Sequence, residues 1–188
     1  MIGNLPRSLE VNGRKYGIRT NYRDILKIIA AFGDPELKDN EKVYVCLFIL
    51  FRDFDSIPRN DLEAAFTAAL KFIDCGAEPG KKKKKRSPRT MDWEQDESLI
   101  FPAINKVAGR EVRSMKYVQW WTFMGWFMEI SDGVYSNILS LRSKKAKGKS
   151  LEKWEREYWN ANKDICELKP KYTEKEKAAQ KKILEMYS

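Results

Sequence analysis

Four carboxylates stand close together after Met91, at Asp92, Glu94, Asp96 and Glu97. Grouped carboxylates can perform acid–base chemistry or bind a metal ion. Acidic residues in the first turn of a helix are also stabilised by the helix dipole, which explains most of this cluster without chemistry. Because no motif supplies a partner group for catalysis, we interpret the cluster as structural.

The chain contains no histidine, the usual general base near neutral pH and the commonest metal ligand. This excludes a Ser-His-Asp triad, a Cys-His pair and a histidine-based zinc site. Cys46, Cys75 and Cys166 lack metal-ligand spacing and are expected to be buried or free thiols. Phosphate-binding glycine motifs and a nucleophile elbow are also missing. We therefore expect no enzymatic activity, no metal and no cofactor.

The net charge of +9 is concentrated in two short segments. Segment 81–89 carries seven basic residues and segment 142–149 carries five, which leaves the remainder of the chain at −3. These segments are candidates for contacts with an acidic partner through Lys81, Lys82, Lys83, Lys84, Lys85, Arg86, Lys144, Lys145 and Lys147. Nucleic acid is disfavoured as that partner, because no aromatic residue that could stack on bases lies within 81–89.

The N-terminal part predicts a β-hairpin followed by helices. Apolar residues alternate with polar ones on both sides of Asn12-Gly13, the preferred two-residue hairpin turn. Apolar periodicity predicts helices at 22–32, 41–51 and 61–73. The second is apolar on nearly every face and is expected to be central in the fold, with a strand as the alternative. Its nine-residue apolar run is too short to span a membrane, which takes about 20 residues.

The second half is expected to be helical and rich in aromatic residues. Pro102 should kink or break its first helix, and 114–130 should form the most apolar helix. Trp120 and Trp121 within it are interpreted as core, with a docking surface as the alternative. A short helix at 134–141 should precede the second basic segment. Ser150 should cap the following helix, and Thr173 with Glu176 should form a capping box for the last one.

These patterns together predict a mainly α protein, with an N-terminal β-hairpin, a helical bundle and a second helical region beyond a basic linker. The segment 76–90 combines glycine, proline, serine and like charges, which is typical of a flexible linker. We expect four parts: 1–75, the hairpin and its helices; 76–90, the linker; 91–169, an aromatic-rich helical domain; and 170–188, a charged C-terminal helix.

Two stretches resemble the phage "gp-fifteen" family of long-tailed bacteriophages: LPRSLEVNGRKYGIRTNYRDIL near the N-terminus and DWEQDESLIFPAINKVAGREVRSMKYVQWWTFMGWFMEISDGVYSNILSLR in the second half. The resemblance covers 5–142. Its most specific residues are Asp92, Gln95, Asp96, Ile100, Gly109, Trp120, Trp121, Phe123 and Arg142. The chain departs from the family pattern at Gln119, where a histidine is common, at Pro102, where a helix former is usual, and in the segment 109–112.

The resemblance implies a function that the residues alone only permit. In phage genomes the family lies between the major tail protein and the tape measure protein, which is the place of tail assembly chaperones. It implies binding to the tape measure protein, cooperation with the major tail protein, self-association, location in the host cell cytoplasm without membrane attachment, and absence from the mature virion. The alternatives are a nucleic-acid-binding module that uses 81–89 and 142–149, and a minor structural virion protein.

Overall fold

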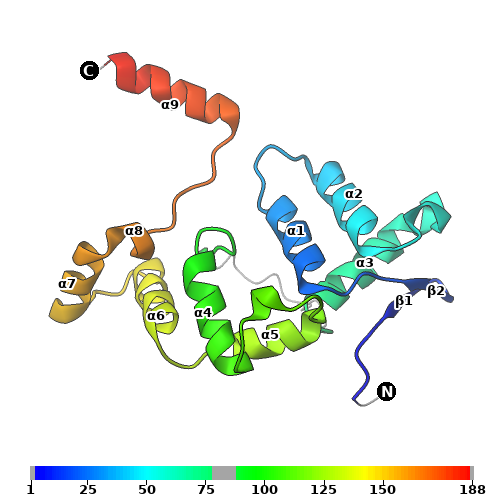
Figure 1. The fold of residues 1–188 in the computed structure, drawn as a ribbon. Helices are drawn as coiled ribbons and strands as arrows, with labels where there is room; N and C mark the ends of the chain where they lie inside the picture. The colour runs from blue at the N-terminus through cyan, green and yellow to red at the C-terminus, as the bar shows by residue number, and fades with distance from the viewer. Residues whose placement is uncertain (1–2, 78–87, 187–188) are drawn as a thin grey trace. The chain divides into compact units, whose positions relative to one another are not determined.

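A computed structural model describes residues 3–77 and 88–186. The described chain is mainly helical, with a two-stranded antiparallel hairpin near its N-terminus (Figure 1). The predicted fold class is therefore confirmed. Most of the expected linker 76–90, including Lys81–Lys85 and Arg86, lies outside the described residues, so the flexibility of that segment stays a prediction.

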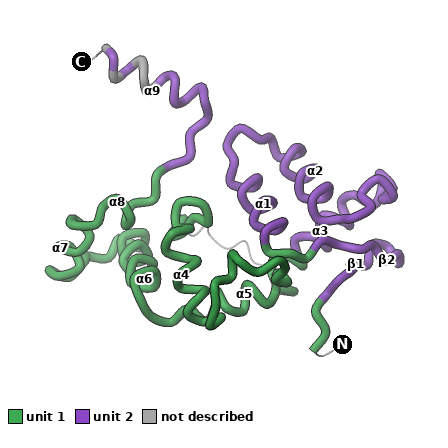
Figure 2. The backbone as a smooth tube through the Cα atoms, viewed as in Figure 1, with its two compact units in different colours: residues 1–5, 20–22, 71–169 green, residues 6–19, 23–70, 170–188 purple. Residues whose placement is uncertain are grey.

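The chain forms two compact units, coloured separately in Figure 2. Unit 1 consists of 1–5, 20–22 and 71–169, and unit 2 consists of 6–19, 23–70 and 170–188. This grouping differs from the expected ranges in one informative way. The end of the third helix belongs with the aromatic-rich second half, and so do Tyr22, the first residue of the first helix, and the two residues before it.

The hairpin of unit 2 consists of β1 (Ser8–Val11) and β2 (Arg14–Gly17). The strands are antiparallel, with Val11 opposite Arg14 across the turn. Asn12 and Gly13 have φ values of 47° and 82°. Positive φ at both central residues is what a two-residue turn that matches the strand twist requires, and asparagine and glycine adopt it at least cost. The predicted hairpin is confirmed.

Unit 2 continues into α1 (Tyr22–Phe32), α2 (Asp39–Leu50), two short 3₁₀ turns at Phe54–Ser56 and Arg59–Asp61, and α3 (Leu62–Ile73). Its buried apolar residues are Val11, Tyr16, Ile18, Ile25, Ile28, Cys46, Leu47, Leu50, Phe51, Ile57, Ala65 and Ala69. The three predicted helices are confirmed within two residues at each end. The last helix, α9 (Glu174–Met186), also belongs to this unit and begins at the predicted Thr173–Glu176 capping box.

One prediction about α2 is wrong. The helix does not lie at the centre of the fold, because its buried residues, Cys46, Leu47 and Leu50, occupy one side only. Tyr44 and Phe48 remain 55% and 54% exposed on another side. Apolar residues all round a helix indicate burial in general, but they do not show whether enough neighbouring elements exist to cover every side.

Unit 1 contains α4 (Glu97–Ala108), a 3₁₀ turn (Val112–Ser114), α5 (Trp120–Met128), α6 (Val134–Ala146), α7 (Lys153–Ala161) and α8 (Lys163–Cys166). Of the kink or break expected at Pro102, the break does not occur, since α4 is one helix across it. Pro102 has no backbone N–H to donate. It lies in the second turn of the helix, however, so few intrahelical hydrogen bonds precede it. No helix in the described ranges is long and apolar enough to cross a membrane.

Three predicted boundaries in unit 1 are corrected. The apolar helix begins at Trp120, not at Ser114, because Val118 and Trp120 are hydrogen-bonded to Tyr22 and Thr20 in extended conformation (3.0 and 2.7 Å). The helix expected at 134–141 runs to Ala146, so most of the basic segment 142–149 is helical. Finally, α7 is capped by Glu152, with Glu155 completing a capping box, and not by Ser150.

The three cysteines are free, as the sequence predicts, and Cys46 and Cys166 are buried. Burial raises the pKa of the Cys46 thiol to about 12. Burial and the nearby Asp74 carboxylate raise the pKa of Cys75 to about 11, and burial raises that of Cys166. A protonated thiol is a poor nucleophile, so none of the three is activated at neutral pH.

We predict that these thiols react slowly with iodoacetamide in the folded protein at pH 8. Only the thiolate reacts, so the rate at the half-buried Cys75 should rise about tenfold for each pH unit up to pH 10. A small model thiol would already level off near its pKa of about 8.5. Mass spectrometry of timed reactions measures each site, and a Cys75 rate that levels off by pH 9 would contradict the raised pKa.

Candidate functional site

Two residues that carry the family resemblance, Asp96 at the N-cap of α4 and Arg142 in α6, form a buried ion pair in unit 1. The Arg142 guanidinium donates from both terminal nitrogens to the Asp96 carboxylate, at 2.7 and 2.8 Å. Both side chains are buried. A bidentate arrangement of this kind is the strongest geometry for an arginine–carboxylate pair.

The other donors of Arg142 are also used. Its Nε donates to the carbonyl of Cys166 (2.8 Å), and its terminal nitrogens donate to those of Ile165 (2.7 Å) and Thr90 (3.1 Å). With the two bonds to Asp96, all five N–H groups of the guanidinium have an acceptor. The desolvation cost of the buried charge is therefore offset, and one side chain connects α6 to α8 and to the chain before α4.

Asp92 and Gln95 complete this polar cluster. The Asp92 carboxylate accepts from the backbone N–H groups of Glu94 and Gln95 (3.0 and 2.9 Å), while its own N–H donates to Asp96 (2.9 Å). The side-chain amide of Gln95 donates to the carbonyl of Lys169 and accepts from its N–H, each at 2.8 Å. Asp92, Gln95, Asp96 and Arg142 thus form one internal structure, and the carboxylates are used in building the fold.

The helix-dipole interpretation of the carboxylates was incomplete. Glu97 is in the first turn of α4, as expected, but Asp96 forms a buried ion pair that sequence spacing did not reveal. A signal was present in another form, because Asp96 and Arg142 are both among the residues on which the resemblance rests. In the described ranges no group of three or more Cys, Asp or Glu side chains is placed to hold a metal ion.

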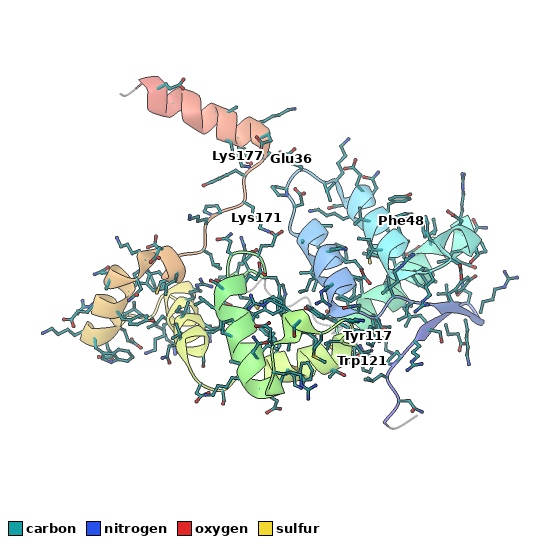
Figure 3. All side chains as sticks on the ribbon, viewed as in Figure 1. Glu36, Phe48, Tyr117, Trp121, Lys171 and Lys177 are labelled. Atoms are coloured by element: carbon teal, nitrogen blue, oxygen red, sulfur yellow. The ribbon has the colours of Figure 1, made fainter. Side chains whose placement is uncertain are left out.

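A second group of resemblance residues lies on α5. The indole N–H of Trp120 donates to the carbonyl of Ile73 (2.8 Å), and that of Trp121 donates to the carbonyl of Phe72 (2.9 Å). These carbonyls lie in the last turn of α3, where carbonyls lack partners within the helix; that of Phe72 also accepts from the backbone N–H of Cys75 (3.1 Å). The paired tryptophans therefore cap the C-terminal end of α3; Figure 3 labels Trp121.

Of the remaining resemblance residues, Phe123 and Ile100 are core, whereas Gly109 is exposed and forms the C-cap of α4 with a φ of 68°. Phe123 is fully buried, and its ring stacks on Tyr22 with centroids 4.3 Å apart. Ile100 is fully buried in α4. Of the two tryptophans, Trp120 is buried and Trp121 is half-buried. A Cβ at Gly76 would lie 3.3 Å from the Trp121 ring, and the φ of Gly76 is +85°, so both space and conformation favour glycine there.

Gln119, where the resemblance predicts a histidine, acts as the N-cap of α5. Its Oε1 accepts from the backbone N–H groups of Trp121 (2.5 Å) and Thr122 (3.2 Å). The departure from the family pattern therefore still supplies a helix-capping acceptor. The Nε2 of Gln119 is buried and, within the described residues, has no hydrogen-bond partner.

The candidate basic contacts in 142–149 are largely engaged inside unit 1. Lys144 pairs with the Glu155 carboxylate, and this hydrogen bond lowers the pKa of Glu155. The ammonium of Lys145 lies 3.9 Å from the centre of the Trp159 ring, a cation–π contact. Lys147 is exposed at the end of α6. Since Arg142 is buried, this segment is part of a helix interface and not a mobile basic loop.

The clearest uncommitted surface is on α2 in unit 2. Tyr44, Phe48 and Phe54 contact one another, with ring centroids 5.4–6.2 Å apart. We call these three residues the aromatic face; Figure 3 labels Phe48. Sequence reasoning missed this surface because it assigned the whole helix to the core. The spacing of Tyr44 and Phe48 by four residues was the signal that could have found it.

A bacteriophage origin now rests on more than resemblance. The family described as Bacteriophage Gp15 protein matches residues 1–168, which include both clusters of internal polar and aromatic residues. The protein is a mainly helical phage protein. It belongs to the Bacteriophage Gp15 family. Comparisons with curated proteins and with solved structures gave no match.

We predict that Arg142→Met lowers the free energy of unfolding by about 3–5 kcal/mol, because it leaves the Asp96 carboxylate buried without its partner. Urea unfolding of the full chain measures this loss. Lys106→Met is the matched control, since the pair between Lys106 and Asp132 is exposed and should add little. Equal losses in the two variants would contradict a structural role for the buried pair.

The two tryptophans should differ in their contribution to stability. We predict that Trp120→Ala costs about 3–5 kcal/mol, the usual loss for a large buried aromatic. Trp121→Ala should cost clearly less, because its ring is half-buried and less apolar area is lost. The same urea unfolding assay compares the two variants. A larger loss at Trp121 than at Trp120 would be inconsistent with the observed burial.

Proposed function

We propose that this chain is a tail assembly chaperone that binds the tape measure protein, keeps it soluble and helps to recruit tail tube subunits. Membership of the Gp15 phage family supports a role in phage assembly, and the family resemblance implies this particular one. The role is one of binding and does not include catalysis.

The observation that carries the proposal is the exposed aromatic face on a folded helical unit. A chaperone for an aggregation-prone chain needs apolar surface that remains accessible after it has folded. Tyr44 and Phe48 provide such a surface, whereas the residues shared with the family in unit 1 are engaged in internal bonds.

The nucleic-acid alternative is weakened by the positions of Lys144 and Lys145, which contact Glu155 and Trp159. Nucleic-acid binding would require affinity for DNA or RNA that falls steeply as salt is raised. The alternative of a minor virion protein would place the chain in purified particles. A chaperone acts in the host cytoplasm and leaves, so mass spectrometry of mature virions separates these two roles.

Co-expression with the cognate tape measure protein tests the proposal directly. We predict that the tape measure protein is recovered in the soluble fraction and copurifies with this chain, because bound apolar segments cannot aggregate. An unrelated helical protein expressed at the same level is the control. If the tape measure protein is equally insoluble with either one, the chaperone proposal fails.

A further inference from the structure

The aromatic face projects from a helix whose other side is already packed. Tyr44 and Phe48 lie one turn apart, while Cys46, Leu47 and Leu50 are buried in unit 2. The exposed rings therefore gain little from the unit's own core and contact mainly one another. Exposed aromatic clusters are uncommon on surfaces without a partner, and aromatic residues are enriched among the residues that dominate protein binding.

Hydrogen bonds from Arg19 hold the C-terminal end of α2, which carries the aromatic face, in place. The Arg19 guanidinium donates to the carbonyls of Phe48, Ile49 and Phe51 at 3.1, 2.9 and 2.8 Å, at the C-terminal end of α2. Its backbone N–H also donates to the carbonyl of Leu50 at 2.7 Å. These bonds join the helix end to the chain that follows the hairpin. A surface held in this way loses little conformational entropy when it binds.

The charges around the face are mostly negative, although the whole chain is strongly positive. The segment 39–63 has six acidic and three basic residues in a chain of net charge +9. Glu41 lies on the same side of α2 as the two rings, and Asp53 and Asp55 flank Phe54; all three are exposed. The basic residues nearest in sequence are Lys42 and Arg52. The helical periodicity places Lys42 on another side of α2 from the rings, and Arg52 donates its Nε to the carbonyl of Ile18 at 3.1 Å.

This charge distribution favours a cationic partner over a second copy of the same face. Two identical faces would bring Glu41, Asp53 and Asp55 toward their own counterparts, and like charges across an interface are unfavourable. The shape indicates a helix, because side chains four residues apart form a ridge that fits the groove of a partner helix. Aromatic anchors with an acidic rim match an apolar stripe bordered by lysine or arginine.

We propose that the aromatic face of α2 binds an amphipathic helix whose apolar stripe is flanked by basic residues. That such a helix belongs to the tape measure protein rests on the proposed function, but the recognition chemistry does not. Tyr44 and Phe48 anchor the apolar stripe, and Asp53 and Asp55 attract its basic flanks. The affinity therefore combines buried aromatic area with a salt-sensitive electrostatic contribution.

Synthetic peptides test the recognition chemistry on the full chain. One probe places leucine at helical spacing with lysine at the other positions, and the second replaces every lysine with glutamate. We expect the lysine peptide to bind at physiological ionic strength, as measured by fluorescence anisotropy, and the glutamate peptide not to bind. Failure of the lysine peptide to bind, or equal binding of the two peptides, overturns the proposal.

Variants locate the binding surface. The double variant Tyr44→Ser/Phe48→Ser should weaken the lysine peptide by about tenfold or more, a loss of at least about 1.4 kcal/mol. Trp154→Ser, which removes another aromatic side chain that is 64% exposed, is the matched control and should change the affinity little. Circular dichroism confirms that both variants are folded. Equal weakening by the two variants, or none by the double variant, overturns the assignment to α2.

Three further measurements distinguish the remaining outcomes. Asp53→Asn/Asp55→Asn should weaken the lysine peptide and reduce its salt dependence, and an unchanged salt dependence contradicts the acidic rim. If sedimentation instead reveals a dimer that Phe48→Ser dissociates, the occupant is a second copy and the proposal is wrong.

Co-expression connects this surface to the proposed function. We expect the tape measure protein to be soluble with the wild-type chain but not with Tyr44→Ser/Phe48→Ser. If the tape measure protein is soluble with the wild-type chain and with the double variant alike, the chaperone role stands but does not use this surface.

Discussion

The guanidinium of Arg142 is buried, and each of its five N–H groups meets an acceptor within unit 1. A charge in such a place is tolerated only when its hydrogen bonds are complete, so the positions of its acceptors are mutually dependent. Asp96 must lie before α4, and the carbonyls of Ile165 and Cys166 must be turned toward α6. The arrangement of the surrounding helices follows from satisfying this one side chain.

A similar constraint operates at the end of α3. Helix C-termini leave carbonyls without partners, and the indole groups of Trp120 and Trp121 supply donors for two of them. The same α5 is positioned at its start by backbone bonds to Thr20 and Tyr22. Large aromatic side chains here contribute both apolar burial and a hydrogen bond, which explains why tryptophan is more suitable than phenylalanine at these sites.

The residues that build the fold differ from those that are available to bind a partner. Most of the residues that carry the resemblance, such as Asp96, Trp120 and Arg142, are buried, and they describe how unit 1 is built more than what the protein touches. The surface available for a partner in unit 2 consists of Tyr44, Phe48 and Phe54, which do not belong to that signature. A family resemblance can thus be strong in its structural residues while the contact surface has to be found from exposure and charge.

Local features of the sequence were sufficient for several elements. Asn12-Gly13 determined the hairpin turn, the apolar stripe of 22–32 determined α1, and Thr173 with Glu176 determined the start of α9, because each depends on bonds between near neighbours. The tertiary structure decided what local patterns leave open. It placed only one side of α2 against the core, and it began α5 at Trp120 by pairing the preceding residues with 20–22.

The tertiary structure also extended α6 through Lys144 and Lys145, because Glu155 and Trp159 contact the charges of these two lysines. The sequence by itself determined the helical class, the family and the residues worth attention. Only the fold determined that Asp96 and Arg142 are a pair and that Tyr44 and Phe48 are exposed. The physical reason is that pairing and exposure depend on which distant segments come into contact. The local pattern of hydropathy or charge along the chain does not show those contacts.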